Sequence, residues 1–498
     1  MDTSGGVGMM DRRAFLRAAG LVGAGSVLVG CSSGGPAEPG AATTPPTAPP
    51  PTTTTTGPPS PPNWESLRAR ISGTVLLPGD AEFDKAGLAF NPLTDTRKPA
   101  AVVRCKNKDD VQACVGVAAE SKIPIAARGG GHSYAGYSVP EGGLLVDMSE
   151  LKEIQVRPDG TVRIGAGARL MDVYTELAKA GRCLPGGSCP TVGIAGLTLG
   201  GGIGVLSRRF GLTCDRLDAA TVVTADSQVI EASGAKGTDL FWALRGGGGG
   251  NFGIVTEFLF STFPAPNLAV FTLRFPAGSV ATALGAWQEW IASAPPELWS
   301  NFVVSGASRA PACHISGCYV GSVGDLNGLL AGLKARPTAR IVQEKDYLQG
   351  MRFFAGGSQR ESFVASSRML PAPADPARVA ELMTGRQGVD LLIDALGGAV
   401  ADLGPSDTAF PHRKAFASAQ IYGKTDASGA ARATTQVAEI RDALAEFTGV
   451  TGYVNYIDPA MPDWANAYYG ANLPRLQQVA KSVDPDKVFG FAQAVPRT

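Results

Sequence analysis

Arg128-Gly129-Gly130-Gly131-His132-Ser133-Tyr134 is the stretch that decides the fold, and it follows a strand-like run from Ile123 to Ala127. Further upstream, Ala100 to Arg104 also predicts a strand, and Asp109 and Asp110 are placed to cap the helix between the two strands. Consecutive glycines let backbone N–H groups crowd around a pyrophosphate. A strand, a helix, a strand and then a glycine cluster therefore indicate a nucleotide-binding unit, although the G-x-G-x-x-G pattern of a Rossmann domain is absent from the cluster.

His132 is the chemically active residue of this loop. A neutral imidazole held beside a bound cofactor is a good nucleophile. A single histidine in a glycine loop can equally be a structural hydrogen-bonding residue, and the loop by itself leaves both interpretations open.

A second glycine-rich stretch runs from Gly186 to Gly204 and reads GGSCPTVGIAGLTLGGGIG. Glycines at such close intervals favour a ligand that lies flat against the backbone. Cys189 stands at the entrance of this loop, where its thiolate could attack a bound electrophile; a buried, inert cysteine is the alternative. A third cluster, Gly246 to Gly250, is followed by Asn251-Phe252-Gly253-Ile254-Val255 and could close around a phosphate or an adenine.

Together these motifs resemble those of the vanillyl-alcohol-oxidase/PCMH superfamily of FAD enzymes, and specifically its berberine-bridge-enzyme-like branch. The resemblance covers Trp64 to the C-terminus and includes Tyr453-Val454-Asn455-Tyr456 near the chain end. It implies an α+β fold, in which a two-part PCMH-type FAD-binding domain is completed by the C-terminal segment and carries an inserted α+β substrate domain. It also implies bicovalent FAD, attached through His132 to the flavin 8-methyl carbon and through Cys189 to ring carbon 6.

The resemblance assigns roles to further residues. The residues expected to contact the cofactor are Arg128, Gly129, Gly130, Gly131, Ser133, Val192, Gly193, Gly196, Gly201, Gly202, Gly204, Asn251, Gly253, Ile254, Val255, Tyr453 and Asn455. Tyr456 is expected to lie over the flavin as the catalytic base, and Tyr134 is expected to face the substrate. Because a tyrosine has an ordinary pKa near 10, Tyr456 needs a neighbouring cation or donor, which the sequence does not identify. Gln420 and His412 are weaker candidates for contact with the substrate, and a structural role suits them equally well.

Val192 bears on the electron acceptor. In the resembled branch, the residue three positions after the covalent cysteine gates access of oxygen to the flavin. Valine at this position goes with oxidases and leucine with dehydrogenases. The alternative is that Val192 is simply a packed β-branched residue in a turn.

The composition excludes some classes of protein. The chain has 498 residues, of which 44% are hydrophobic, and its 44 Lys and Arg balance 44 Asp and Glu. A nucleic-acid-binding protein would normally show a basic excess. His132, His314 and His412 are far apart and lack metal-ligand spacing, so no metal site is expected. Of the eight cysteines, no pair is singled out for a disulfide.

The first residues predict export. Arg12-Arg13 precede an apolar run from Ala18 to Gly30, which is typical of a twin-arginine signal and too short to span a bilayer. Leu28-Val29-Gly30-Cys31 resembles a lipobox, so Cys31 is expected to be acylated; an ordinary signal peptide is the alternative. We therefore expect a protein anchored by lipid on the outer side of the cytoplasmic membrane of a bacterium.

The chain is expected to divide into five parts. A signal at 1–31 precedes a Pro- and Thr-rich linker at 32–63, whose composition cannot bury enough apolar surface to fold. An FAD-binding domain follows at 64–265, then a substrate domain at 266–450, and the C-terminal segment at 451–498 completes the FAD site.

The function expected from the resemblance is that of an FAD-dependent oxidase. It would take hydride from an alcohol or a sugar hemiacetal carbon and pass the electrons to oxygen, giving hydrogen peroxide. The alternatives are a dehydrogenase with a non-oxygen acceptor, an enzyme that oxidises bulky natural products, and an exported lipoprotein that binds a ligand without chemistry. The sequence does not identify the substrate.

Overall fold

The computed structural model describes residues 60–497, so the predicted signal and lipid anchor, and nearly all of the predicted linker, lie outside the described residues. All the described elements belong to one compact unit that starts at Pro58. Within residues 60–497, no helix is both long enough and apolar enough to cross a bilayer.

A small mixed sheet forms the N-terminal part and delivers the first glycine loop. Its strands run in the order β1 (Thr74–Leu76), β2 (Ala101–Arg104), β4 (Leu144–Asp147) and β3 (Ile125–Arg128). Helix α3 (Lys108–Ser121) joins β2 to β3, and both strands pair in parallel with β4. The first glycine loop therefore starts at the carboxyl end of β3, where ligands commonly bind in α/β sheets.

The cap of α3 differs from the expectation. The side chain of Asn107 accepts the hydrogen bond from the backbone N–H of Asp110 and caps the helix, whereas Asp109 and Asp110 lie in its first turn. The Asp110 carboxylate instead accepts hydrogen bonds from the backbone N–H groups of Ser72 and Lys106, each at 2.8 Å. The prediction of Asp109 and Asp110 as caps was wrong because asparagine two residues earlier satisfies the helix end equally well.

A second, five-stranded antiparallel sheet completes the glycine-rich half of the molecule. Its order is β5 (Ile154–Val156), β6 (Thr161–Gly165), β10 (Ile254–Ser261), β8 (Leu217–Val223) and β9 (Val229–Ser233). The remaining elements of this half are α1 (Trp64–Arg70), α2 (Phe83–Ala86), α4 (Leu170–Lys179), β7 (Arg182–Cys183), α5 (Ile194–Leu199), α6 (Ser207–Phe210), α7 (Thr238–Leu244) and β11 (Phe263–Pro264).

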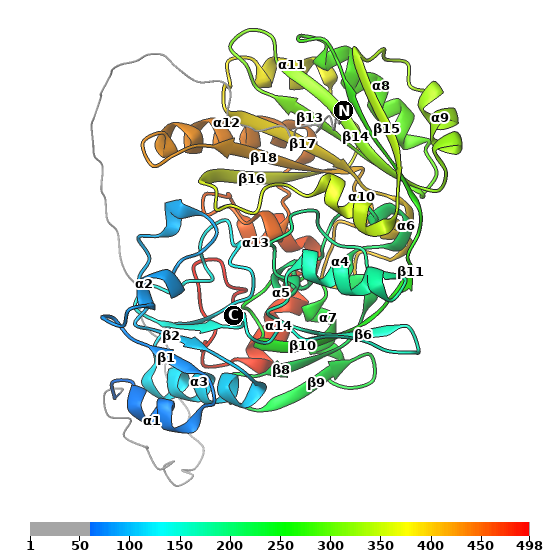
Figure 1. The fold of residues 1–498 in the computed structure, drawn as a ribbon. Helices are drawn as coiled ribbons and strands as arrows, with labels where there is room; N and C mark the ends of the chain where they lie inside the picture. The colour runs from blue at the N-terminus through cyan, green and yellow to red at the C-terminus, as the bar shows by residue number, and fades with distance from the viewer. Residues whose placement is uncertain (1–59, 498) are drawn as a thin grey trace, which may run out of the picture. The chain divides into compact units, whose positions relative to one another are not determined.

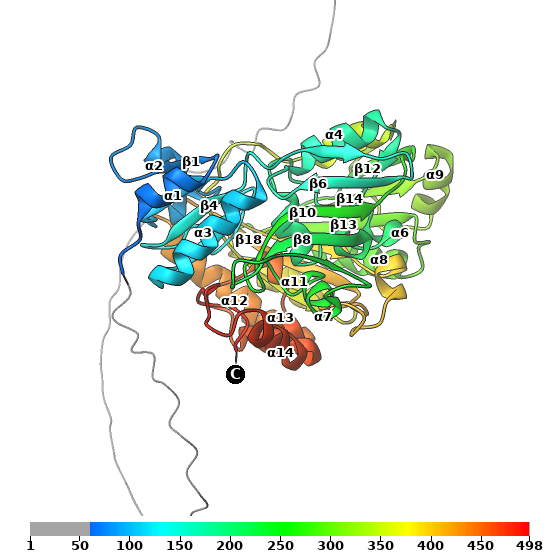
Figure 2. The same ribbon diagram turned by 90° about the horizontal axis from the view of Figure 1, so that it is seen from below.

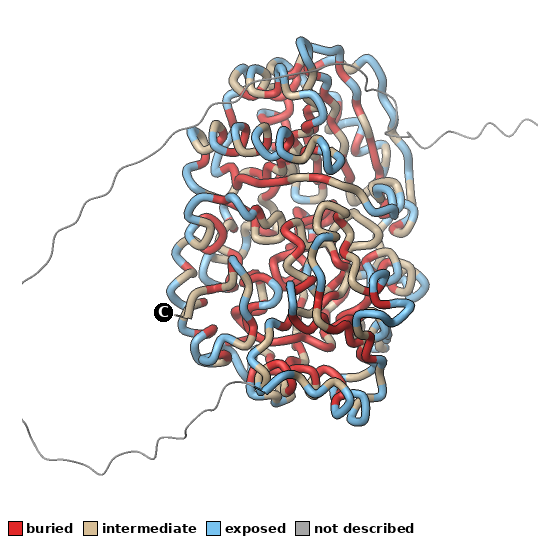
Figure 3. The backbone as a smooth tube through the Cα atoms, turned by 90° about the vertical axis from the view of Figure 1, so that its left-hand side faces the viewer, coloured by how far each residue is buried: buried red, intermediate tan, exposed pale blue. Residues whose placement is uncertain are grey.

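The upper half in Figure 1 is a seven-stranded antiparallel sheet with helices packed on one face. The strand order is β15 (Ala339–Lys345), β12 (Leu268–Arg274), β14 (Ala312–Val320), β13 (Leu298–Ser305), β17 (Val389–Ala395), β18 (Ala417–Lys424) and β16 (Phe363–Leu370). Helices α8 (Val280–Ala292), α9 (Val323–Ala331), α11 (Pro376–Met383) and α12 (Ala430–Thr448) cover this face, whereas α10 (Tyr347–Phe354) packs on the opposite face, where Tyr347 and Met351 join the core of the glycine-rich half. Figure 3 shows buried residues in both halves of the molecule. They form two large apolar cores, one of which lies between this sheet and the helices that cover it.

The C-terminal segment returns to the glycine-rich half. Helices α13 (Trp464–Tyr469) and α14 (Leu473–Val483), drawn in orange-red and red, lie below the seven-stranded sheet in Figure 1, and α14 lies beside α7 in both ribbon views (Figures 1 and 2). Arg475 of α14 forms an ion pair with Asp239 of α7. The architecture is that of a PCMH-type FAD-binding domain completed by the C-terminal segment, with an α+β domain inserted, and it confirms the predicted fold class.

Candidate active site

The first two glycine loops pack against each other backbone to backbone. A Cβ atom on Gly130 would lie 2.2 Å from the backbone nitrogen of Gly193, and one on Gly193 would lie 2.3 Å from that of Gly130. No side chain fits at either position, so both glycines are required for this close approach. The approach brings together two loops whose key residues are more than fifty positions apart in sequence.

His132 and Cys189 meet at the hydroxyl of Thr191. The His132 Nε2 atom lies 2.9 Å from Thr191 Oγ1, and the Cys189 Sγ atom lies 3.9 Å from the same oxygen. Because the hydroxyl engages Nε2, Nδ1 is the ring nitrogen left available for another bond. The structure thus places the two predicted attachment residues side by side, and Thr191 is a contact that the motif alone did not reveal.

The imidazole of His132 is held neutral and in a fixed plane. Burial, together with the nearby Arg169 guanidinium, lowers its pKa to about 4. Its ring stacks on Phe90, with centroids 3.8 Å apart and planes inclined by 21°. A neutral, oriented imidazole suits nucleophilic attack on a bound group.

The C-terminal motif lies directly on the second glycine loop. Tyr453 is buried, and its hydroxyl accepts hydrogen bonds from the backbone N–H of Gly202 at 2.8 Å and from the Asn455 amide at 2.9 Å. The same amide group of Asn455 donates to the Leu197 carbonyl at 2.9 Å. Both residues therefore fix the loop to the C-terminal segment.

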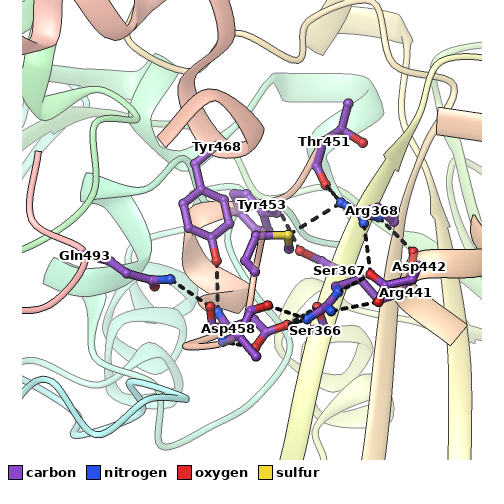
Figure 4. Close-up of polar contacts among 12 residues, drawn as sticks. Ser366, Ser367, Arg368, Arg441, Asp442, Thr451, Tyr453, Asp458, Tyr468 and Gln493 are labelled. Atoms are coloured by element: carbon purple, nitrogen blue, oxygen red, sulfur yellow. Dashed lines mark hydrogen bonds and ion pairs between the residues drawn. The ribbon is translucent and has the colours of Figure 1, made fainter. Parts of the chain in front are cut away.

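A polar network holds this motif from the other side, at the edge strand β16 (Figure 4). Ser367 Oγ accepts a hydrogen bond from the backbone N–H of Tyr453 at 2.9 Å. The neighbouring Ser366 donates to the Asp458 carboxylate at 2.6 Å, and Arg441 of α12 donates to the same carboxylate at 2.8 Å. Asp458 follows Tyr456 by two residues, so the network clamps the tyrosine turn at both ends.

Two tyrosines that are distant in sequence, Tyr134 of the first glycine loop and Tyr456 of the C-terminal motif, stack on each other. The rings of Tyr134 and Tyr456 have centroids 5.5 Å apart and are nearly parallel, at 7°. Gln420 of β18 donates a hydrogen bond to the Tyr134 hydroxyl at 2.5 Å. The structure therefore brings together three predicted residues, Tyr134, Tyr456 and Gln420.

The environment keeps both tyrosine hydroxyls protonated. Burial raises the pKa of Tyr456 well above its ordinary value, and the neighbouring Asp394 and Tyr134 raise it further. Burial also raises the pKa of Tyr134. Among the groups that act on the Tyr456 hydroxyl, none is the cation that the sequence led us to look for.

Asp394 is the residue that sequence reasoning missed. It lies on β17, where it pairs with Asn301 of β13 and Ser418 of β18. Burial raises its pKa from 3.8 to about 6, partly offset by a hydrogen bond from Asn301. A carboxylate that ionises near pH 6 close to Tyr456 can accept a proton at neutral pH, which the tyrosine cannot do alone. The signal available in the sequence was that Asp390, Leu392 and Asp394, at every second position, lie on the same face of the strand.

The remaining predicted residues mainly support the loops. Arg128 is buried and forms a 2.9 Å ion pair with Asp147, which joins the ends of β3 and β4. Ser133 Oγ accepts from the backbone N–H of Tyr137 at 3.1 Å. Asn251 bridges the third glycine cluster to the chain end, because its amide donates to the Gly247 carbonyl and its oxygen accepts from the Val495 N–H.

His412 bonds to the backbone of the C-terminal segment. Its Nε2 atom lies 3.2 Å from the carbonyl oxygen of Tyr468, and its pKa is lowered to about 4 by burial. Its ring packs on Phe410. This arrangement favours the structural interpretation of His412 over contact with substrate.

The site fits a bound FAD. A Cβ atom on Gly196 would meet nothing within 4 Å, so open space borders the second loop. The hydroxyls of Ser138 and Thr198 are buried without a hydrogen-bond partner among the described residues. Buried polar groups are normally satisfied, so these two hydroxyls are suited to a polar ligand. The remaining loop residues, Gly129, Gly131, Val192, Gly201, Gly204, Gly253, Ile254 and Val255, lie in or next to these three glycine clusters.

Comparison with known proteins identifies the family. Residues 99–233 match the family model described as FAD binding domain, and residues 452–496 match the model described as berberine and berberine like. The uncharacterised FAD-linked oxidoreductase YgaK of Bacillus subtilis is 33% identical over 86% of this chain and 98% of its own length. Further relatives include a xylooligosaccharide oxidase of Thermothelomyces thermophilus.

Solved structures agree. The berberine-bridge-enzyme-like protein 1 of Physcomitrella patens matches with a TM-score of 0.83 and 30% identity, over 88% of this chain and 99% of that one. Glucooligosaccharide oxidase of Acremonium strictum, described as carrying 6-S-cysteinyl, 8α-N1-histidyl FAD, matches with a TM-score of 0.80 and 26% identity, over 87% and 99%. The chain belongs to the berberine-bridge-enzyme-like family of FAD-linked oxidoreductases in the vanillyl-alcohol-oxidase/PCMH superfamily.

Proposed function

We propose that the chain is an exported oxidase of carbohydrates or related alcohols, in which FAD is held covalently by His132 and Cys189. The observation that carries the proposal is the meeting of these two side chains at Thr191, with distances of 2.9 and 3.9 Å to its hydroxyl. Two nucleophiles placed this close can both reach one ring system. The glucooligosaccharide oxidase with the same kinds of linkage supports this assignment.

Bound FAD would supply an acceptor for hydride from the substrate carbon and would hand the two electrons to oxygen, giving hydrogen peroxide. The chain's own task is then to orient the substrate hydroxyl and remove its proton. Tyr456 would contact this hydroxyl and relay the proton toward Asp394, the nearby group with a pKa of about 6. Gln420 holds the stacked Tyr134 in place by its hydrogen bond.

Sugars are the substrate class that the site supports best. Phe363 is buried; it packs edge-on against Tyr134 with centroids 4.9 Å apart and stacks on Tyr422 at 4.7 Å, so it supports the Tyr134 ring beside Tyr456. Aromatic faces offer apolar contact area to ligands whose edges remain polar. The names of several relatives, which are oligosaccharide oxidases, support the same class.

Export remains part of the proposal. The paired Arg12-Arg13 and the sequence ending at Cys31 support twin-arginine export and lipid anchoring at the outer side of the cytoplasmic membrane. This export route carries folded proteins, so flavin can be attached before translocation.

The experiment is a screen of oligosaccharides, monosaccharides and bulky alcohols with purified protein, in which oxygen consumption and peroxide release are measured together. We expect one peroxide per oxygen consumed with at least one sugar. Flavin reduction by a sugar without oxygen consumption would instead indicate a dehydrogenase with another acceptor. A protein that releases its flavin in acid would refute covalent attachment.

A further inference from the structure

Strand β15 forms an unpaired edge of the seven-stranded sheet. It pairs with β12 on one side, and no described strand pairs with its other side (Figure 1). The pairing with β12 runs without a bulge from Ala339 to Lys345. Open edges usually carry a bulge, a proline or charged side chains that prevent pairing with another chain. Strand β15 has no bulge or proline between Ala339 and Lys345, and it carries charges at Arg340, Glu344 and Lys345, so only a register that matches opposite charges allows it to pair.

The strand also exposes an apolar side chain. Ile341 is 45% exposed. Among the described residues, only Ile341 and Val450 are large hydrophobic residues that are exposed to this degree. An exposed isoleucine in the middle of an open strand favours association.

The register shows which backbone groups are free. Hydrogen bonds from Phe275 N–H to the Cys313 carbonyl and from Gly321 N–H to the Asn267 carbonyl show that odd-numbered residues of β12 bond to β14. Successive residues of an antiparallel strand direct their N–H and C=O groups to opposite neighbouring strands, so the even-numbered residues of β12 bond to β15. Their partners on β15 are odd-numbered. The free N–H and C=O groups of β15 therefore belong to Arg340, Val342 and Glu344.

We infer that β15 pairs with β15 of a second copy of this chain, antiparallel and about a twofold axis at Val342. This register aligns the free groups with each other, because Val342 then faces the partner's Val342 and Arg340 faces the partner's Glu344. It gives a closed, isologous contact in which the two sheets become one.

Charge selects this register. Arg340 and Glu344 are both exposed, and neither forms an ion pair within residues 60–497. About the twofold axis, Arg340 of each copy faces Glu344 of the other copy, so the interface contains two such pairs. Opposite charges directly across an antiparallel pair stabilise it. The two Ile341 side chains become diagonal neighbours on the opposite face of the joined sheet, which removes exposed apolar surface from water.

Helix α9 leaves room beside the strand. An open groove runs between α9 and β15 and is lined by Val323, Asn327, Ala331, Arg340 and Val342. The guanidinium of Arg340 donates a hydrogen bond to the Asn327 side chain in this groove. This hydrogen bond places the Arg340 side chain on the α9 face of the sheet, which is the face where the partner's Glu344 would lie.

The test measures the mass in solution of the full-length, flavin-loaded protein by light scattering and analytical ultracentrifugation from low to high micromolar concentration. We expect the wild type to dimerise, and Arg340→Glu and Glu344→Arg to be monomeric when studied alone. A mixture of these two variants restores complementary pairs and should form a heterodimer. Arg336→Glu, an equal charge change outside the strand, should leave dimerisation intact.

Val342→Pro is an independent test, because it removes an N–H that points away from β12 and so costs no bond within the chain. It should also give a monomer, with flavin absorbance and thermal unfolding close to those of the wild type. A wild type that stays monomeric at every concentration overturns the inference. So does a dimer that survives Arg340→Glu or Val342→Pro, or a mixture of the two charge variants that fails to associate.

Discussion

Asp394→Asn tests the proton acceptor, because it removes the charge and keeps the shape of the side chain. The new amide can also donate to the Asn301 side-chain oxygen, which is buried without a hydrogen-bond partner in the described structure. We therefore expect the variant to fold and to keep its flavin, while losing the group that ionises near pH 6.

The structure gives both the size and the sign of the effect on stability. Burial raises the pKa of Asp394 from 3.8 to about 6, so holding the ionised carboxylate costs about 3 kcal/mol. The folded wild type binds this proton more tightly than the unfolded chain does. The contribution of the protonated Asp394 side chain to stability is complete below pH 3.8 and is lost as the pH rises through 6. Asp394→Asn removes this loss and should unfold at a higher temperature than the wild type at pH 7.5, with little difference near pH 4.

Activity should move in the opposite direction. Anaerobic stopped-flow reduction of the flavin by the best sugar should accelerate as the pH rises through 6 in the wild type, because only the carboxylate accepts the proton. In Asp394→Asn the rate should fall by roughly two to four orders of magnitude and lose this pH dependence. A wild-type rate that is flat from pH 5 to 7, or an asparagine variant that is nearly as fast, would refute the assignment.

Three further predictions concern the flavin and its partners. His132→Ala and Cys189→Ala should each retain one covalent flavin by intact-mass spectrometry, and the double variant should lose it to denaturant; a wild type without added FAD mass contradicts the linkage. Tyr456→Phe should keep fold and flavin but reduce the flavin roughly two to four orders of magnitude more slowly, and near-normal reduction would shift the role to Tyr134. Val192→Leu should slow reoxidation by oxygen in stopped flow and leave reduction by sugar nearly unchanged, whereas unchanged reoxidation would leave Val192 as a packing residue.

The parts of the site that could be predicted from the sequence depend on local chain geometry. The contact between Gly130 and Gly193 admits no side chain, so glycine at both positions is a direct physical requirement. His132 and Cys189 stand inside the same loops and were found together with them. The cap of α3 shows where local reasoning fails, because Asn107 and Asp109 are both good capping residues and only the folded chain distinguishes them.

Asp394 could not be found in this way, because its role depends on strand register. It reaches the tyrosine pair only because β17 lies between β13 and β18, which surround the carboxylate with Asn301 and Ser418. In the proposed mechanism the glycine loops would hold the cofactor through their own backbone, whereas the proton acceptor Asp394 and Gln420 would come from the inserted sheet. Substitutions on this face of the sheet can therefore change the proton transfer and the substrate contacts while His132, Thr191 and Cys189 stay in place. The sheet, rather than the loops, is where we expect the specificity of this enzyme to be determined.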